Sequence, residues 1–75
     1  PNPTTGRLRI MWDETGYSEL SVFDSGGVLL IRQILPENGR ITEIDLSRLS
    51  AGMYFVRLTG EEKKPLQRKV VLKKD

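Results

Sequence analysis

Few side chains in this 75-residue chain could do chemistry, because it contains no cysteine and no histidine. Without cysteine there are no disulfides, thiolate metal sites or thiol nucleophiles. Without histidine the chain lacks the commonest metal ligand and the usual general base near neutral pH. Serine is the remaining nucleophile, and no histidine or Ser-x-x-Lys pattern is present to activate it. We therefore predict that the chain is not an enzyme, with no catalytic residues, no metal site and no cofactor.

Two pairs of adjacent carboxylates, Asp13 with Glu14 and Glu61 with Glu62, are the remaining candidates for acid and base roles. Such roles require that the two carboxylates face each other across a cleft, whereas residues adjacent on a strand point apart. Both pairs fall in expected turns, so we interpret them as solvated turn charges. A calcium site formed by Asp13, Glu14 and Asp24 is a weaker alternative, because the D-x-D-x-D density of a loop site is missing.

The positive charge of the chain is concentrated near its C-terminus. The net charge is +2, and residues 61–75 hold six basic residues against three acidic ones. A basic strand could contact nucleic acid or an anionic membrane surface, but this one has no aromatic side chains on which bases could stack. Alternating lysines on an exposed strand more often protect a sheet edge against aggregation. We favour that interpretation and expect no nucleic-acid partner.

The chain has the length of one domain. No apolar run approaches the roughly 18 residues that cross a bilayer, so we expect no transmembrane segment. No signal peptide is visible, and the first residue is proline. We interpret residues 1–75 as a single domain from the C-terminal end of a longer protein.

Strand patterns recur along the whole chain, whereas helical periodicity is weak and there is one alanine. Turn-forming residues separate the strand-like segments, which are spaced by about ten residues. This organisation predicts an all-β fold, an immunoglobulin-like antiparallel β-sandwich of six or seven strands. The expected strands cover residues 7–12, 17–24, 28–35, 40–46, 53–59 and 66–73. Because residues 28–35 are almost continuously apolar, we expect a central strand that is covered on both faces.

Alternation within these segments also predicts the core. The inward positions are large aliphatic side chains and one tyrosine: Leu8, Ile10, Leu20, Val22, Leu30, Ile44, Leu46, Leu49, Tyr54, Val56, Leu58, Val70 and Leu72. Trp12 shares the face of Leu8 and Ile10, so we expect it to be buried rather than exposed as a sugar-binding platform.

Residues 45–52, which we call the arch, join two expected strands by a compact connection. Asp45 can accept hydrogen bonds from backbone N–H groups of the arch, Leu49 can fill the core beneath it, and Gly52 frees the backbone at the corner. Tyr54 follows, with a hydroxyl that could reach back to a main-chain group. This pattern resembles the tyrosine corner of immunoglobulin-like sandwiches.

Taken together, the turns and strands resemble one protein family over essentially the whole chain. The opening Pro1-Asn2-Pro3 with Gly6 resembles its P-N-P-x-x-G motif, and Phe23-Asp24 with Gly27 resembles its aromatic-D-x-x-G motif, although Val28 stands where members usually carry a basic residue or Gln. Asp45-Leu46-Ser47 with Leu49, Gly52, Tyr54 and Val56 resembles its D-L-S-x-L-x-x-G-x-Y-x-V motif. The last strand, with Lys69, Lys73 and Lys74, resembles its basic end. The chain is thus similar to the C-terminal sorting domain of type IX secretion cargo, also called the Por secretion system C-terminal domain.

The resemblance implies a secretion signal at the end of a larger exported protein. Such a domain passes through the periplasm, is recognised by the type IX translocon and outer-membrane shuttle proteins, and reaches the cell surface or the medium. A cell-surface sortase normally removes it. The residues that carry the resemblance, and that we take as candidates for recognition, are Pro1, Asn2, Pro3, Gly6, Asp24, Gly27, Asp45, Leu46, Leu49, Gly52, Tyr54, Lys69, Lys73 and Lys74.

The alternative is a generic immunoglobulin-like or fibronectin-like binding module of a cell-surface protein. It would share the strands and the tyrosine of the arch, but it would need neither the Pro1-Asn2-Pro3 start nor a strand that ends at the C-terminus.

Overall fold

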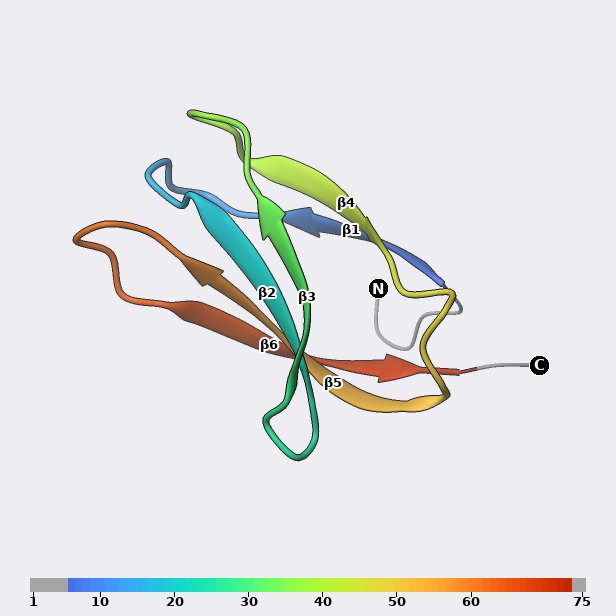
Figure 1. The fold of residues 1–75 in the computed structure, drawn as a ribbon. Helices are drawn as coiled ribbons and strands as arrows, with labels where there is room; N and C mark the ends of the chain where they lie inside the picture. Colours follow the sequence, from blue (N-terminus) through green and yellow to red (C-terminus); the bar gives the residue numbers. More distant parts are fainter. Residues whose placement is uncertain (1–5, 74–75) are drawn as a thin grey trace.

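A computed structural model of the chain describes residues 6–73, and these form an all-β fold of six antiparallel strands (Figure 1). This confirms the predicted β-sandwich, and residues 6–73 include no helix. The strands in chain order are β1 (Arg7–Met11), β2 (Glu19–Asp24), β3 (Leu29–Ile34), β4 (Ile41–Asp45), β5 (Gly52–Thr59) and β6 (Leu66–Leu72).

The strands form two sheets of unequal width. The larger sheet has four strands in the order β3-β2-β5-β6, and the smaller sheet consists of β1 paired with β4. Leu8 lies opposite Ile44 in the small sheet, and Leu20 lies opposite Leu58 in the large one. All four side chains are buried, so alternation along each strand turns one face of each sheet toward the common core.

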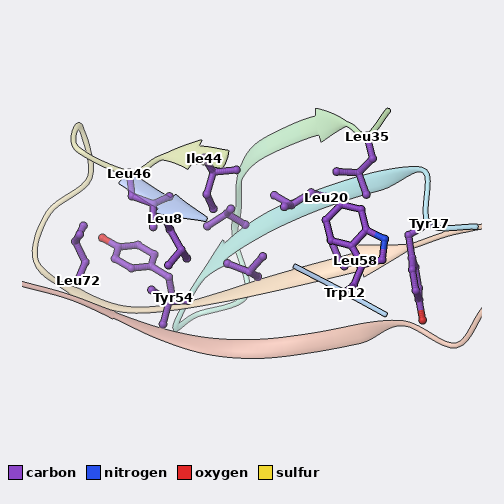
Figure 2. Close-up of a cluster of buried hydrophobic side chains, with 13 residues drawn as sticks. Leu8, Trp12, Tyr17, Leu20, Leu35, Ile44, Leu46, Tyr54, Leu58 and Leu72 are labelled. Atoms are coloured by element: carbon purple, nitrogen blue, oxygen red, sulfur yellow. The ribbon is translucent and has the colours of Figure 1, made fainter. Parts of the chain in front are cut away.

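The core is one cluster enclosed between the two sheets (Figure 2). Ten of the residues predicted to face inward are buried there, as is Trp12, which is 6% exposed. Ile10 and Leu49 are partly buried and pack against the cluster. The buried hydrophobic residues are Leu8, Trp12, Tyr17, Leu20, Val22, Leu35, Ile44, Leu46, Tyr54, Val56, Leu58, Val70 and Leu72.

The prediction for β3 is wrong. This strand was expected at the centre of a sheet with both faces covered, but it pairs on one side only, with β2, and forms an edge of the large sheet. Leu30, predicted in the core, is 40% exposed. The register between β2 and β3 shifts between Val22 and Phe23, so Leu30 falls at a bulge where alternation no longer specifies the face.

The turns have the geometry that their residues favour. Gly16 and Gly27 adopt positive φ values of +105° and +87°, and Asn38 adopts +58°. Glycine adopts this region without strain because it has no Cβ atom, and asparagine tolerates it because its short polar side chain can hydrogen-bond locally. Glu62, also at +58°, is an exception to this preference. Gly60 is required for another reason: a Cβ atom there would lie 2.1 Å from the carbonyl oxygen of Gly16.

Candidate recognition surface

The candidate recognition residues gather at one end of the sandwich. Because the strands alternate in direction along the chain, β1, β3 and β5 begin at the same end at which β2, β4 and β6 finish. Gly6, the 24–27 turn, the arch and Lys73 therefore share this end, which we call the motif end (Figure 1). The predicted residues Pro1, Asn2, Pro3 and Lys74 lie outside the described residues.

The 24–27 turn is held by the side chain of Asp24. Its Oδ1 atom accepts hydrogen bonds of 2.9 Å from the backbone N–H groups of Gly26 and Val28. The backbone closes the same turn, since Gly27 N–H donates to the carbonyl oxygen of Asp24 at 3.0 Å. Asp24 therefore specifies the shape of the turn, and a short acidic side chain at this position satisfies amides that would otherwise be left to solvent. Val28 itself is 57% exposed.

Asp45 organises the arch in a similar way. Its Oδ1 atom accepts a hydrogen bond of 2.9 Å from the backbone N–H of Ser47. The pKa of Asp45 is lowered, first by the hydrogen bond from the Ser47 side chain and then by that backbone N–H, with a smaller contribution from the positive charges of Arg7 and Arg48. The carboxylate is therefore ionised near neutral pH, where it stabilises the arch.

The arch is also tied to the start of β1. Leu46 N–H donates to the carbonyl oxygen of Gly6 at 2.9 Å, and Leu49 N–H donates to the carbonyl oxygen of Leu46 at 3.0 Å. Leu46 is fully buried, and Leu49 packs against the core as expected. These contacts place Gly6, the last residue of the first predicted motif, beside the third motif, although about forty residues separate Gly6 from Leu46 in the sequence.

Tyr54 forms the predicted tyrosine corner. Its ring lies in the core, and its hydroxyl donates a 2.5 Å hydrogen bond to the carbonyl oxygen of Ser50 within the arch (Figure 2). Gly52 lies between the two, with a φ of +157° and the Tyr54 ring about 4 Å from where its Cβ would be. Because Tyr54 belongs to β5, this hydrogen bond ties the arch to the large sheet.

The two described lysines of the basic end are exposed, as expected. Lys69 lies opposite Phe55 on the outer face of the large sheet, and Lys73 follows β6 directly. The strand β6 is an edge of the large sheet, which agrees with the interpretation that its lysines protect an edge.

Sequence reasoning missed an aromatic pair on the outer face. Phe23 and Phe55 lie directly opposite each other on β2 and β5, and both are partly exposed. The Arg57 guanidinium lies over the Phe23 ring, 5.4 Å from its centroid. Strand alternation could have revealed this pair. Phe23 and Phe55 are sequence neighbours of the inward Val22 and Val56, so their side chains point to the outer face. This pair adjoins the 24–27 turn and so extends the motif end onto the large sheet.

The acidic residues do not converge. Asp13 and Glu14 lie in the loop after β1, whereas Asp24 is the last residue of β2, at the opposite end of the sandwich. Within residues 6–73 no three Asp or Glu side chains are grouped so that they could hold a metal ion. Glu14 forms an ion pair with Lys63. The hydrogen bond that the Glu14 carboxylate accepts from the Lys63 ammonium group lowers the pKa of Glu14.

The sequence and this geometry can be compared with known proteins. Residues 1–73 match the model of a family described as the secretion system C-terminal sorting domain. The chain belongs to this family. Neither the curated proteins nor the solved structures give a significant match.

As a sorting domain of this family, the chain is a C-terminal secretion signal for type IX export. A signal of this kind acts on the secretion system and directs export to the cell surface or the medium. No helix among the described residues is long and apolar enough to span a membrane. Most of the matched motif residues have a visible structural role at the motif end, because they shape turns or anchor the arch.

Proposed function

We propose that this sorting domain is a non-catalytic address label, residues 1–75, at the end of a larger exported protein, and that the motif end is the surface that the type IX translocon and its outer-membrane shuttle proteins contact. The observation that carries this proposal is the convergence of Gly6, the 24–27 turn, the arch and Lys73 on one end of the fold. A receptor that meets a single end of a rigid sandwich could contact all of these regions at once.

The route that we propose has two further steps. The domain crosses the periplasm in its folded state, and after export a cell-surface sortase removes it from its cargo. The rigidity of the motif end supports recognition in the folded state, because Asp24, Asp45 and Tyr54 each fix a turn by a hydrogen bond to the backbone. A preorganised surface does not have to be ordered when it binds, so less free energy is lost on docking.

The test reverses charge at the motif end and at the opposite end. One variant carries glutamate at Lys69, Lys73 and Lys74, and its matched control carries glutamate at Arg40, Lys63 and Lys64, which flank the loops at the opposite end. Each is fused behind a signal peptide and a foreign passenger in a type IX-competent strain. We expect export of the passenger to fall in the first variant and to persist in the control.

Folding must be measured separately, because the control loses the ion pair that Lys63 forms with Glu14 in the unsubstituted domain. The thermal midpoint of each purified domain shows whether a loss of export reflects docking or unfolding, and exposed substitutions should shift stability little. Unchanged export in the Lys69, Lys73 and Lys74 variant would show that these lysines only protect an edge. An equal loss in both folded variants would refute the motif end as the docking surface.

A further inference from the structure

The connection between β3 and β4 carries an asparagine followed by a glycine, Asn38-Gly39. It passes from the large sheet to the small sheet at the end of the sandwich opposite the motif end (Figure 1). Asn38 is exposed, and its side-chain amide forms no hydrogen bond with another residue of the described range 6–73. The amide group is therefore free to turn toward the backbone of the next residue.

The shape of this turn favours both residues. Asn38 adopts a φ of +58°, in the left-handed region where asparagine is enriched among residues other than glycine. A Cβ atom on Gly39 would lie 2.7 Å from Cγ of Pro36 and 3.1 Å from the Pro36 carbonyl oxygen, so a larger residue would force the turn to shift. The fold therefore favours an Asn-Gly pair at this position.

An Asn-Gly pair can react with itself, because glycine has no Cβ atom to obstruct its backbone nitrogen. The Gly39 nitrogen loses its proton and attacks the side-chain amide carbon of Asn38. A C–N bond forms and closes a succinimide ring, the bond from that carbon to Nδ2 breaks, and ammonia leaves with the proton. No atom is oxidised or reduced in this step.

Water then opens the succinimide ring by adding to one of its two carbonyl carbons. Addition to the side-chain carbonyl yields aspartate in a normal backbone. Addition to the main-chain carbonyl yields isoaspartate, in which the backbone runs through Cβ and Cγ and is longer by one carbon atom. Either product carries a carboxylate in place of the amide and is slightly heavier than asparagine.

We propose that Asn38 is a site of spontaneous deamidation, and that its isoaspartate form loosens the core at this end of the sandwich. Leu35, which precedes the turn, is buried in the core. Arg40, which follows the turn, accepts a 2.9 Å hydrogen bond at its carbonyl oxygen from the backbone N–H of Trp12. A longer backbone between Leu35 and Arg40 changes their separation and so displaces Trp12. This inference goes beyond the proposed function and does not depend on it, because the turn lies away from the motif end.

The turn itself limits the rate of the reaction. The Gly39 N–H, whose proton must be lost, donates a 3.0 Å hydrogen bond to the carbonyl oxygen of Pro36. Cyclisation requires this bond to open, and a local opening of an exposed turn costs much less free energy than global unfolding. We therefore expect Asn38 to react in the folded domain about two- to tenfold more slowly than in the unfolded chain, as corresponds to one net hydrogen bond.

The test follows the 75-residue chain during prolonged incubation at mildly alkaline pH, in buffer and in concentrated guanidinium chloride. Peptide mapping by mass spectrometry locates the gain in mass, and a protein-isoaspartate methyltransferase detects isoaspartate. We expect both signals at Asn38. Asn2 is the internal control, because it is the only other asparagine and precedes Pro3, which has no backbone N–H to lose.

Two variants separate the causes. Asn38→Gly retains a residue that adopts positive φ but removes the side-chain amide, so this turn should show no gain in mass. Freshly purified Asn38→Asp carries the new charge in a normal backbone. The isoaspartate form, separated by chromatography, should differ from Asn38→Asp in the emission of Trp12, the single tryptophan, and its thermal midpoint should be lower by about 4 °C or more.

Three results would overturn the proposal. The first is an unchanged mass at Asn38 in buffer, over a period that converts Asn38 fully in guanidinium chloride, because the turn would then block the reaction. The second is an equal gain in mass at Asn2, which would exclude a succinimide route. The third is an isoaspartate form with the thermal midpoint of Asn38→Asp, which would refute the effect on the core. No step of this test involves export, so its failure leaves the proposed function untouched.

Discussion

Tyr54 offers the most informative single perturbation of the fold, because removal of its hydroxyl changes one hydrogen bond and leaves the ring in place. In Tyr54→Phe, the 2.5 Å bond to the Ser50 carbonyl oxygen is lost. Ser50 is exposed, so water can reach that carbonyl group once the arch relaxes. We therefore expect the cost of an ordinary net hydrogen bond, about 0.5 to 1.5 kcal/mol of unfolding free energy. For a domain of this size that corresponds to a decrease in Tm of very roughly 4 to 8 °C per kcal/mol.

The chain provides its own matched control, since Tyr17 is buried to the same extent and also donates to a backbone carbonyl group. That bond, to Lys64, is longer at 3.1 Å, so Tyr17→Phe should cost less than Tyr54→Phe. Truncation to Tyr54→Ala removes the buried ring as well, and we expect a loss of about 2 to 4 kcal/mol. This is a large part of the total stability of a small domain.

The measurement is urea unfolding of the four proteins, followed by Trp12 fluorescence and by circular dichroism. A Tyr54→Phe variant as stable as the wild type would show that the corner hydrogen bond does not hold the arch. A Tyr54→Ala variant that unfolds at the wild-type urea midpoint would refute the assignment of this face to the core.

Two further predictions concern the arch and the loops. Because the pKa of Asp45 is lowered in the folded state from its ordinary value of 3.8, its contribution to stability is complete above that value and is lost as pH falls through the folded-state pKa. Asp45→Asn should therefore lower the urea midpoint at pH 7, and the difference from the wild type should shrink as the pH falls below 3.8 and the carboxylate becomes protonated; a constant difference would exclude this carboxylate as its cause. Gly60→Ala places a Cβ atom 2.1 Å from the Gly16 carbonyl oxygen and should cost about 1 to 3 kcal/mol in thermal unfolding, whereas Gly26→Ala, with its nearest contact at 3.4 Å, should cost less than about 1 kcal/mol. Equal costs would contradict the close approach of the two loops.

Alternation specified most of the fold because one face of each sheet is buried. In β5, Tyr54, Val56 and Leu58 are buried while Arg57 is exposed, as the period of two predicts. Ser21 shows a limit of this rule: alternation with the inward Leu20 and Val22 places it on the outer face, yet it is buried at 7% exposure. Its cross-strand neighbours are Arg32 and Arg57, and a small side chain between two such long ones has little contact with solvent.

The failures have two physical causes, and the first is that local sequence does not report sheet order. A continuous apolar run is typical of a strand covered on both faces, but β3 lies at an edge and exposes Leu30 and Ile34. Tyr17 and Leu35 were missed from the core because they lie just outside β2 and β3, where the strand period no longer applies.

For the candidate site too, the sequence predicts the local role of single residues but not their arrangement in space. The sequence identified Asp24, Asp45, Gly52 and Tyr54 as turn or corner residues, and the hydrogen bonds of Asp24, Asp45 and Tyr54 confirm these local roles. Their convergence on one end follows from the directions of the six strands, and no single segment of the sequence encodes it.

The most direct test of the central claim is the fraction of a passenger protein that reaches the cell surface when residues 1–75 are fused behind a signal peptide and that passenger. The measurement compares a type IX-competent strain with an otherwise identical strain that lacks the translocon. If the domain is a secretion signal, the passenger should reach the cell surface or the medium in the first strain. In the second strain the intact fusion should stay in the periplasm. Retention of the folded fusion in both strains, with a native cargo still exported by the competent one, would contradict the claim that this domain is a sufficient signal.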